Sequence, residues 1–365
     1  MRASLANKIF VVIFLMLISA PLLMLILGDT KTVSVSEKRE LKTWVRWKDS
    51  ESTAQFFSNV SDYVQDHFGF RDDLISLNAK MLVALKQSPV DKVIIGKDNW
   101  LFYKTYDALS LASFDKAKII AAIERRARHV SYRAQVLADR GIAYTYVVAP
   151  NKMVMYLENM PSIYVLSENN RMYGLFSSEL DSSGIKFHFD LQHHLIQQKK
   201  HNPKFDFYYK NDTHWNHYGA YIAYQGIVSF INQRYPNIEL SPASYSFIAK
   251  EKVGGDLAKF IGLDNALVAI EPSAEFPECA RAGQVKAIRK GILQGQCKLN
   301  ETKIVFIGDS FRTNLYPFVA ESSGTVFMVS QGISHKKLDN LIERVQPDLV
   351  IEEIVQRNLG KPLPY

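Results

Sequence analysis

The sequence predicts an α/β domain in which a mainly parallel sheet lies between two layers of helices. From Phe114 onward, apolar strand-like runs alternate with helical runs, as in a sheet built with crossover helices. The run Ile142–Ala149 is almost continuously apolar, which is typical of a strand that is buried on both faces. A second such run, Lys303–Ile307, leads into a helical stretch. Together these observations favour a doubly wound sheet.

The composition is that of a folded protein. The chain has 365 residues, of which 47% are hydrophobic and 22% charged. These values exclude a disordered chain, a collagen-like repeat and a polytopic membrane protein. The net charge of +7 suits an anionic polymer or a membrane surface but fixes neither. The basic residues are scattered and form no Arg-rich helix, so we do not expect a nucleic-acid partner.

The N-terminal region predicts a membrane anchor. Ile9–Leu27 is a run of 19 residues without a charge. About 17–25 apolar residues span a bilayer, whereas a cleaved signal peptide has an apolar core of about 7–15. We therefore expect an uncleaved anchor over residues 1–28; the alternative is a long signal peptide cut within or just after this run. Polar residues 29–50 predict a tether, and residues 51–365 a single domain.

The charges that flank this segment favour a cytoplasmic domain. Arg2 and Lys8 precede the apolar run, and more cations follow it: Lys31, Lys38, Arg39, Lys42, Arg46 and Lys48. The positive-inside rule, applied to this count, would leave the domain in the cytoplasm. Long domains translocate largely regardless of nearby charge, however, so the orientation needs a further observation.

Helical spacing and turn residues predict the elements in order. Phe56–Val64 has apolar residues at spacings of three and four, Asp66–Arg71 breaks this helix, and Leu74–Gln87 resumes it. Residues 93–103 predict a strand–turn–strand unit. The helix Lys116–Arg140 ends at Gly141, a frequent C-terminal cap. The further expected elements are the strands Ile142–Ala149, Ile185–Phe189, Lys303–Ile307, Thr325–Val329 and Leu349–Ile354, and the helices His193–Lys200, Asn216–Tyr235, Thr313–Glu321 and Lys336–Val345.

The two cysteines, Cys279 and Cys297, leave two alternatives open. They are 18 residues apart and lack the C-x-x-C spacing of a zinc site. A disulfide between them would stabilise the fold by about 3 kcal/mol and would indicate an oxidising compartment. Two free thiols are the alternative.

Two segments contain residues that could take part in catalysis. Gly308-Asp309-Ser310-Phe311 follows a buried strand and opens a helix, which places Ser310 where open α/β sheets carry their sites. The helix N-terminus can stabilise an oxyanion there, although Ser310 could instead be a simple helix cap.

The second segment is Asp212-Thr213-His214-Trp215. In an extended chain, Asp212 and His214 share a face, so a carboxylate could orient the imidazole that activates a serine. Asp212 as a helix cap and His214 as a buried structural histidine are the alternatives. His217 is a second candidate base, and a metal held by Asp212, His214 and His217 is a further alternative, although no fourth ligand is evident. We otherwise expect no metal and no cofactor.

Taken together, these segments resemble the alginate O-acetyltransferase family of AlgJ and AlgX, which has a permuted SGNH hydrolase-like fold. Gly308-Asp309-Ser310-Phe311 resembles the serine block of SGNH hydrolases and Asp212-Thr213-His214-Trp215 their Asp/His block, in the reversed order that this family shows. Weaker similarities extend from about residue 36 to residue 357. They include Asp66–Arg71, Gly96–Phe102, Val148–Lys152 and Pro347–Glu353.

The resemblance implies a three-layer αβα domain that carries a Ser310–His214–Asp212 triad on the periplasmic side of the bacterial inner membrane. Only 55 residues follow Ser310, so we expect the single-domain, membrane-anchored AlgJ-like architecture. The implied acceptor is a secreted polysaccharide, alginate-like or other. The implied acetyl donor is a multipass membrane acyltransferase partner.

The sequence also offers candidate oxyanion and substrate-binding residues. The backbone N–H of Ser310 is an expected oxyanion donor, and Asn151, at a strand end, is a second candidate. Trp215 is a candidate for stacking on a sugar ring, although alternation would turn it away from the site. Three functions remain open: an O-acetyltransferase, an SGNH-type esterase that uses water as acceptor, and a non-catalytic component of an export complex.

Overall fold

The computed structural model describes residues 5–27, 32–34, 39–105, 116–164, 169–182, 187–201, 204–238, 240, 243–281, 285–289, 291–297 and 300–361. The chain forms two compact units. One unit comprises residues 1–90 and 258–265, and the other comprises residues 91–257 and 266–365. The domain boundary expected at residue 51 stays a prediction.

The first unit is helical and contains the apolar N-terminal segment. Helix α1 (Leu5–Leu27) has 23 residues and a mean hydropathy of 3.0, enough to cross a membrane, a property that a signal sequence shares. The short strands β1 (Val33–Ser34) and β2 (Arg39–Glu40) pair within the expected tether. Helices α2 (Thr53–His67) and α3 (Arg71–Ala84) follow, with the break between them where the sequence predicts it.

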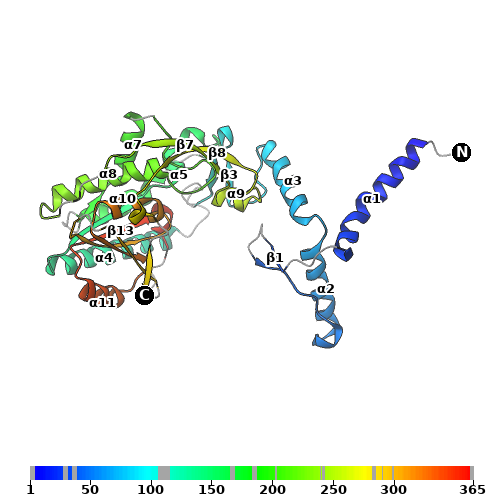
Figure 1. Ribbon diagram of the computed structural model, residues 1–365, viewed down its shortest axis with the longest axis horizontal. Helices are drawn as coiled ribbons and strands as arrows, with labels where there is room; N and C mark the ends of the chain where they lie inside the picture. The colour runs from blue at the N-terminus through cyan, green and yellow to red at the C-terminus, as the bar shows by residue number, and fades with distance from the viewer. Residues whose placement is uncertain are drawn as a thin grey trace. The chain divides into compact units, whose positions relative to one another are not determined.

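The second unit is built on a seven-stranded sheet with the order β6-β5-β13-β11-β12-β10-β9. Figure 1 labels β13, one of its central strands. Five neighbouring strands are parallel, and β10 and β9 add an antiparallel edge. The strands are β5 (Ala143–Ala149), β6 (His188–Phe189), β9 (Lys286–Arg289), β10 (Ile292–Gln296), β11 (Lys303–Gly308), β12 (Thr325–Ser330) and β13 (Leu349–Val355). The small hairpins β3 (Val93–Ile95)–β4 (Leu101–Tyr103) and β7 (Phe247–Val253)–β8 (Val268–Ala274) complete the strands among the described residues.

Helices cover both faces of the sheet, which confirms the three-layer α/β class. Alternate residues of β5 enter two separate cores: Tyr144, Tyr146 and Val148 face one, and Val147 and Ala149 the other. The first core is closed by α4 (Lys116–Asp139), α6 (Asn169–Ser182) and α11 (His335–Val345). The second is closed by α7 (Leu191–His201), α8 (His217–Arg234) and α10 (Arg312–Glu321). The short helices α5 (Lys152–Met155) and α9 (Asp256–Phe260) follow β5 and β7 in the chain.

The structure also contains elements that the sequence analysis does not predict. These include α6, the short helices α5 and α9, the strands β1 and β2, and the antiparallel strands β7, β8, β9 and β10. The expected strand Ile185–Phe189 is reduced to His188–Phe189, and residues 185–186 lie outside the described residues.

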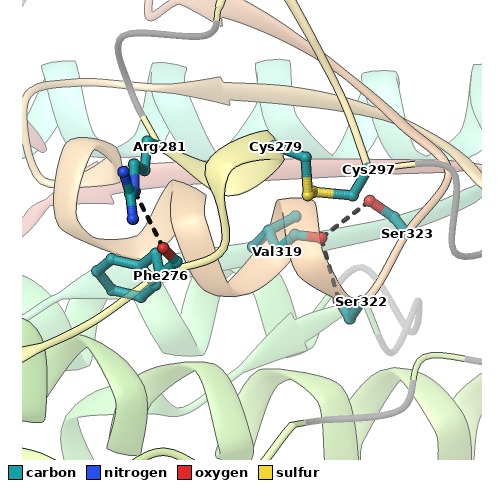
Figure 2. The surroundings of a disulfide bond; sticks show 7 residues. All are labelled: Phe276, Cys279, Arg281, Cys297, Val319, Ser322 and Ser323. Carbon is teal, nitrogen blue, oxygen red and sulfur yellow. Dashed lines mark hydrogen bonds between the residues drawn. A yellow bond between two sulfur atoms is a disulfide. The ribbon is translucent and has the colours of Figure 1, made fainter.

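The two cysteines form a disulfide, which decides between the two alternatives left open by the sequence. Cys279 lies in a single 3-10 turn (Glu278–Ala280), and Cys297 follows the last residue of β10. Figure 2 shows the bond beside the C-terminal end of α10, where the hydroxyls of Ser322 and Ser323 donate to the carbonyl of Val319. The bond therefore ties the loop after β8 to the antiparallel edge of the sheet.

Replacing both cysteines with serine should lower the free energy of unfolding by about 3 kcal/mol, because the unfolded chain regains the entropy of an open 18-residue loop. Urea denaturation followed by tryptophan fluorescence measures this change. Dithiothreitol should destabilise the wild-type protein to a similar extent and leave the double variant unaffected. Equal stability of the two proteins in oxidising buffer would contradict the prediction.

Candidate active site

Ser310 lies in the turn between β11 and α10. The strand before it is fully buried from Ile304 to Gly308, whereas Ser310 itself is exposed. A Cβ at Gly308 would lie 2.9 Å from Oε2 of Glu353 and 3.1 Å from Cβ of Arg312, so a larger residue there would require these side chains to shift. The sharp exit from a buried strand thus presents the serine hydroxyl at the carboxyl edge of the sheet.

The carboxylate of Asp309 fixes the shape of this turn. Its Oδ1 accepts the backbone N–H of Phe311 at 3.0 Å. Its Oδ2 accepts the backbone N–H of Val355 and the amide of Asn358, both at 2.9 Å. Asp309 therefore connects the serine turn to the end of the neighbouring strand β13, and the aspartate of Gly-Asp-Ser serves here as a structural anchor.

The sequence-predicted residues Asp212, His214 and Ser310 come together in one chain of hydrogen bonds. Nδ1 of His214 lies 2.6 Å from Oδ1 of Asp212, and Nε2 of His214 lies 2.6 Å from Oγ of Ser310. Oδ1 of Asp212 also accepts the backbone N–H of His214 at 3.0 Å. This is the geometry that a serine nucleophile needs, with a base on its hydroxyl and a carboxylate that orients the base.

The environment of Asp212 favours its ionised form. Burial by itself would raise the pKa of this carboxyl, but the hydrogen bond and charge of His214 outweigh that effect, helped by the backbone N–H groups of Asp256 and His214. The net result is a pKa well below the usual range. The carboxylate is therefore charged at neutral pH and can stabilise an imidazolium on His214.

A second carboxylate, which the sequence analysis missed, supports the same segment. Asp256 accepts the backbone N–H of Thr213 at 2.7 Å and the hydroxyl of Thr213 at 2.5 Å. Its own N–H donates to Oδ2 of Asp212 at 3.0 Å, and its Oδ2 lies 3.6 Å from Nδ1 of His214. Burial, and then the charge of Asp212, raise the pKa of Asp256. The pKa values of the two carboxyl groups are thus shifted in opposite directions, although both groups border the imidazole of His214.

A glycine pair before Asp256 was the available signal for this contact. Gly255 has a φ of +139°, and a Cβ there would lie 2.4 Å from the carbonyl oxygen of Asn211. The backbone of this loop must therefore approach the Asp212 segment without a side chain between them. Gly254-Gly255 in the sequence marks such an approach, although it does not say which segment is approached.

His217 lies away from the serine, so its predicted roles as a competing base and as a metal ligand are wrong. Its Nδ1 accepts the backbone N–H of Ala274 at 3.3 Å, and its ring contacts Phe276 edge to face. Burial, together with the charges of Lys252 and Lys250, lowers its pKa to about 4. Among the described residues, the side chains spaced closely enough to hold an ion are Asp212, His214 and Asp256. Both ring nitrogens of His214 already have partners in Asp212 and Ser310.

Trp215 faces the interior rather than the solvent, as alternation along the chain suggests. Its side chain is fully buried, and its Nε1 donates to the carbonyl of Phe311 at 2.9 Å. The idea that this ring stacks on a sugar is therefore wrong for the described conformation. The neighbouring rings of Tyr208, Tyr218 and Tyr316 are buried as well.

Asn151 and Arg357 lie near Thr213, the residue between Asp212 and His214. Both line a small cavity together with Lys152 and Thr213. Asn151 is 2% exposed and its backbone N–H donates to Oε1 of Gln356 at 3.2 Å, so its predicted part in an oxyanion site stays a prediction. Arg357, which the sequence analysis missed, donates to the hydroxyl of Thr213 at 3.5 Å and places a positive charge 5.2 Å from the ring of Phe311.

The chain matches a known protein family. The family profile described as "SGNH hydrolase-like domain, acetyltransferase AlgX" matches residues 93–326, well over half of the chain. The chain therefore belongs to the AlgJ/AlgX-like family of SGNH hydrolase-like proteins.

Individual relatives point the same way. The chain is 28% identical over 175 residues to the "Probable alginate O-acetylase AlgJ" of Pseudomonas syringae pv. tomato, a match that covers 47% of this chain and 42% of that protein. The solved O-acetyltransferase domain of Pseudomonas putida AlgJ superposes with a TM-score of 0.53 at 17% identity, over 74% of this chain and 92% of that one. PatB1 of Bacillus cereus superposes with a TM-score of 0.56 at 16% identity, over 73% of this chain and 97% of that one. At this identity the two structures are evidence of the shared fold.

Asp256→Asn should lower kcat/KM for a small activated acetyl ester roughly 10-fold, the low end for residues that orient a functional side chain. The amide keeps the size of the carboxylate but weakens the hold on the N–H and hydroxyl of Thr213, which adjoins His214. Ester hydrolysis by the purified variant measures the effect. Glu275→Gln removes an exposed carboxylate just after β8 and is the matched control. Equal rates for Asp256→Asn and wild type would show that Asp256 is a bystander.

Proposed function

We propose that this protein is an O-acetyltransferase that transfers acetyl groups, through an acetyl-Ser310 intermediate, to hydroxyl groups of a secreted polysaccharide. The observation that carries this proposal is the chain of two 2.6 Å contacts from Asp212 through His214 to Ser310. Family membership supports the proposal, and the relative named as an alginate O-acetylase points to acetyl transfer rather than another chemistry.

The first half-reaction loads the serine. Nε2 of His214 accepts the proton of Ser310 as Oγ attacks the carbonyl carbon of the acetyl donor, and Asp212 stabilises the imidazolium. The backbone N–H of Ser310, next to the N-terminus of α10, can stabilise the oxyanion of the tetrahedral intermediate. Collapse of this intermediate breaks the bond to the donor oxygen or sulfur, which leaves with the proton from His214.

The second half-reaction transfers the acetyl group from Ser310 to the acceptor. His214 removes the proton from an acceptor hydroxyl, whose oxygen attacks the acetyl-serine ester, and the Ser310 oxygen then recovers the proton. Ser310 is exposed, and the His214 side chain retains 21% of its surface, so a bulky chain can approach the intermediate. This openness favours a polymeric acceptor over a small molecule that would need an enclosing pocket.

The same residues would serve an esterase if water replaced the sugar hydroxyl. The difference between the two activities lies in water exclusion and acceptor binding, so the esterase remains the second candidate function. The intact triad geometry disfavours the third candidate, a non-catalytic export component.

We further propose that α1 anchors the protein in the bacterial inner membrane with the second unit in the periplasm. The disulfide supplies the observation that the flanking charges lack, because such bonds persist in oxidising compartments. In this arrangement the acetyl donor would come from a multipass membrane acyltransferase that delivers acetyl groups across the membrane.

Ser310→Ala, His214→Ala and Asp212→Ala should each reduce hydrolysis of a small acetyl ester by about 10³-fold or more, while the proteins remain folded. Double variants should lose little more, because the three residues act as one unit. Steady-state kinetics and circular dichroism measure both properties. Near-normal activity of Ser310→Ala would show that the nucleophile is assigned to the wrong residue.

The topology can be tested with reporters fused after Tyr365. Alkaline phosphatase, which is active only in the periplasm, should be active in this fusion, because long domains translocate despite the flanking cations. A cytoplasmic fluorescent reporter at the same site should be dark. The opposite result would follow the positive-inside count and would remove the secreted polysaccharide as a substrate.

A further inference from the structure

Lys152 is a buried lysine whose side chain reaches the backbone of the triad segment. It is the first residue of α5, separated from the end of β5 by two residues, and is 4% exposed. Its Nζ donates to the carbonyl oxygens of Leu101 at 2.6 Å, Lys210 at 2.8 Å and Asp212 at 3.1 Å. The ammonium also lies 4.8 Å from the ring centre of Trp100. One side chain thereby joins three segments of the second unit.

The hydrogen-bonding capacity of this side chain matches its surroundings. An ammonium group has three N–H donors and no acceptor, and Nζ has three carbonyl oxygens within hydrogen-bond distance. Within the part of the chain that the structure describes, no carboxylate is paired with Lys152 at 4.0 Å or less. Backbone carbonyl dipoles and the face of an aromatic ring therefore stabilise the charge, as is typical of a lysine that links backbone segments.

We propose that Lys152 is a positioning residue for acetyl transfer. Its ammonium group, hydrogen-bonded to the carbonyl of Asp212, holds the Asp212–His214 segment so that His214 faces Ser310. The reaction therefore requires the side chain of Lys152 to be protonated. The inference rests on the proposed function of the triad. Lys152 itself contacts neither Ser310 nor the ring of His214 in the hydrogen bonds of the site. It acts through the backbone of Asp212.

Loss of the proton would break this arrangement. A neutral amine has two N–H donors and one lone pair, so one of the three carbonyl oxygens would face a lone pair instead of a hydrogen. The bond to Asp212 is the longest of the three, at 3.1 Å, and is the one most easily lost. A shift of the Asp212 backbone would then move the carboxylate that orients His214.

The surroundings of Lys152 lower its pKa into the range of ordinary assay pH. Burial lowers the pKa of Lys152 to about 7, against the opposing charges of Asp212, Glu271, Asp256 and Asp206. These carboxylates face Lys152 from the segment before α8, from the start of α9 and from β8. We therefore expect an alkaline limb in the activity profile that begins near neutral pH.

The sign of the stability change separates this role from a merely structural one. The pKa of Lys152 is lower in the folded protein than its ordinary value of 10.5, so the unfolded chain binds more protons between pH 7 and 10.5. By linkage, the contribution of Lys152 to stability rises with pH over this range. Activity should fall while this contribution rises, the opposite of what loosening of the fold would give.

The experiment compares wild type, Lys152→Met and the matched control Lys199→Met in the full-length protein. Lys199 also donates to a backbone carbonyl, that of Met155 at 2.6 Å, and covers the ring of Tyr156 at 3.7 Å. It does not contact the triad segment in any hydrogen bond of the described residues. The readouts are kcat and KM for a small acetyl ester from about pH 5.5 to 9, with urea stability at each pH.

On the alkaline side of the activity profile, the kcat of wild type and of Lys199→Met should fall about tenfold per pH unit, with little change in KM. Lys152→Met should have a kcat at least about tenfold lower at neutral pH and no alkaline limb. A wild-type limb in Lys152→Met would overturn the proposal. If Ser310→Ala remained active, the proposed function would fail instead, so the two failures are distinguishable.

A chemically modified variant provides the test if Lys152→Met does not fold. Alkylation of Lys152→Cys with 2-bromoethylamine under denaturing, non-reducing conditions installs γ-thialysine, an ammonium side chain that is less basic than lysine. Cys279 and Cys297 are protected by their disulfide. Refolded protein should be active, with its alkaline limb at lower pH than that of wild type. An unmoved limb, or inactivity of a folded thialysine protein, would overturn the proposal.

Discussion

The hydrogen bond between Nε2 of His214 and Oγ of Ser310 joins two segments that lie 96 residues apart in the chain. Everything that the site can do depends on keeping these two atoms together. Two further bonds run beside it: Nε1 of Trp215 donates to the carbonyl of Phe311, and the amide of Asn314 donates to the carbonyl of Trp215. The residues next to His214 and Ser310 are thus hydrogen-bonded to each other, which keeps the two side chains together even if their own hydrogen bond is weak.

Polar groups beneath the site extend this support. Asp309 anchors the serine turn to β13, Asp256 holds Thr213, and Lys152 holds the carbonyl of Asp212. Buried polar groups are costly unless they have partners, so such a network specifies one arrangement of the segments. The apolar cores on the two faces of the sheet supply most of the stability, and the polar network sets the geometry at the carboxyl edge.

The sequence was sufficient for the parts of the site that lie in short continuous motifs. Ser310 follows a buried strand, and Asp212 precedes His214 by two residues, so these candidates could be found from neighbours in the chain. That the two segments act together was implied only by the family resemblance. The supporting groups could not, because Asp256 and Lys152 reach the triad segment across 43 and 60 residues. Trp215 shows the limit of the aromatic argument, since an exposed ring and a core ring look alike until the packing is known.

The fold shows the same division. The parallel strands were predicted because burial on both faces leaves most of their residues apolar. The edge strands β9 and β10 escaped prediction, because β9 is exposed along its length and β10 contains glutamines and a glycine. Helix α6 also escaped prediction, since its asparagines, serines and glycine are weak helix formers and the helix depends on packing against the sheet and α4.

The central claim is that Ser310 carries acetyl groups to a secreted polysaccharide. The most direct measurement is the O-acetyl content of that polymer, determined by mass spectrometry in cells that lack this protein and carry either the wild-type protein or Ser310→Ala. We expect the wild-type protein to restore the O-acetyl groups and Ser310→Ala not to restore them. A rise in O-acetyl content when the protein is absent would instead identify an esterase, and equal content in all strains would contradict a catalytic role.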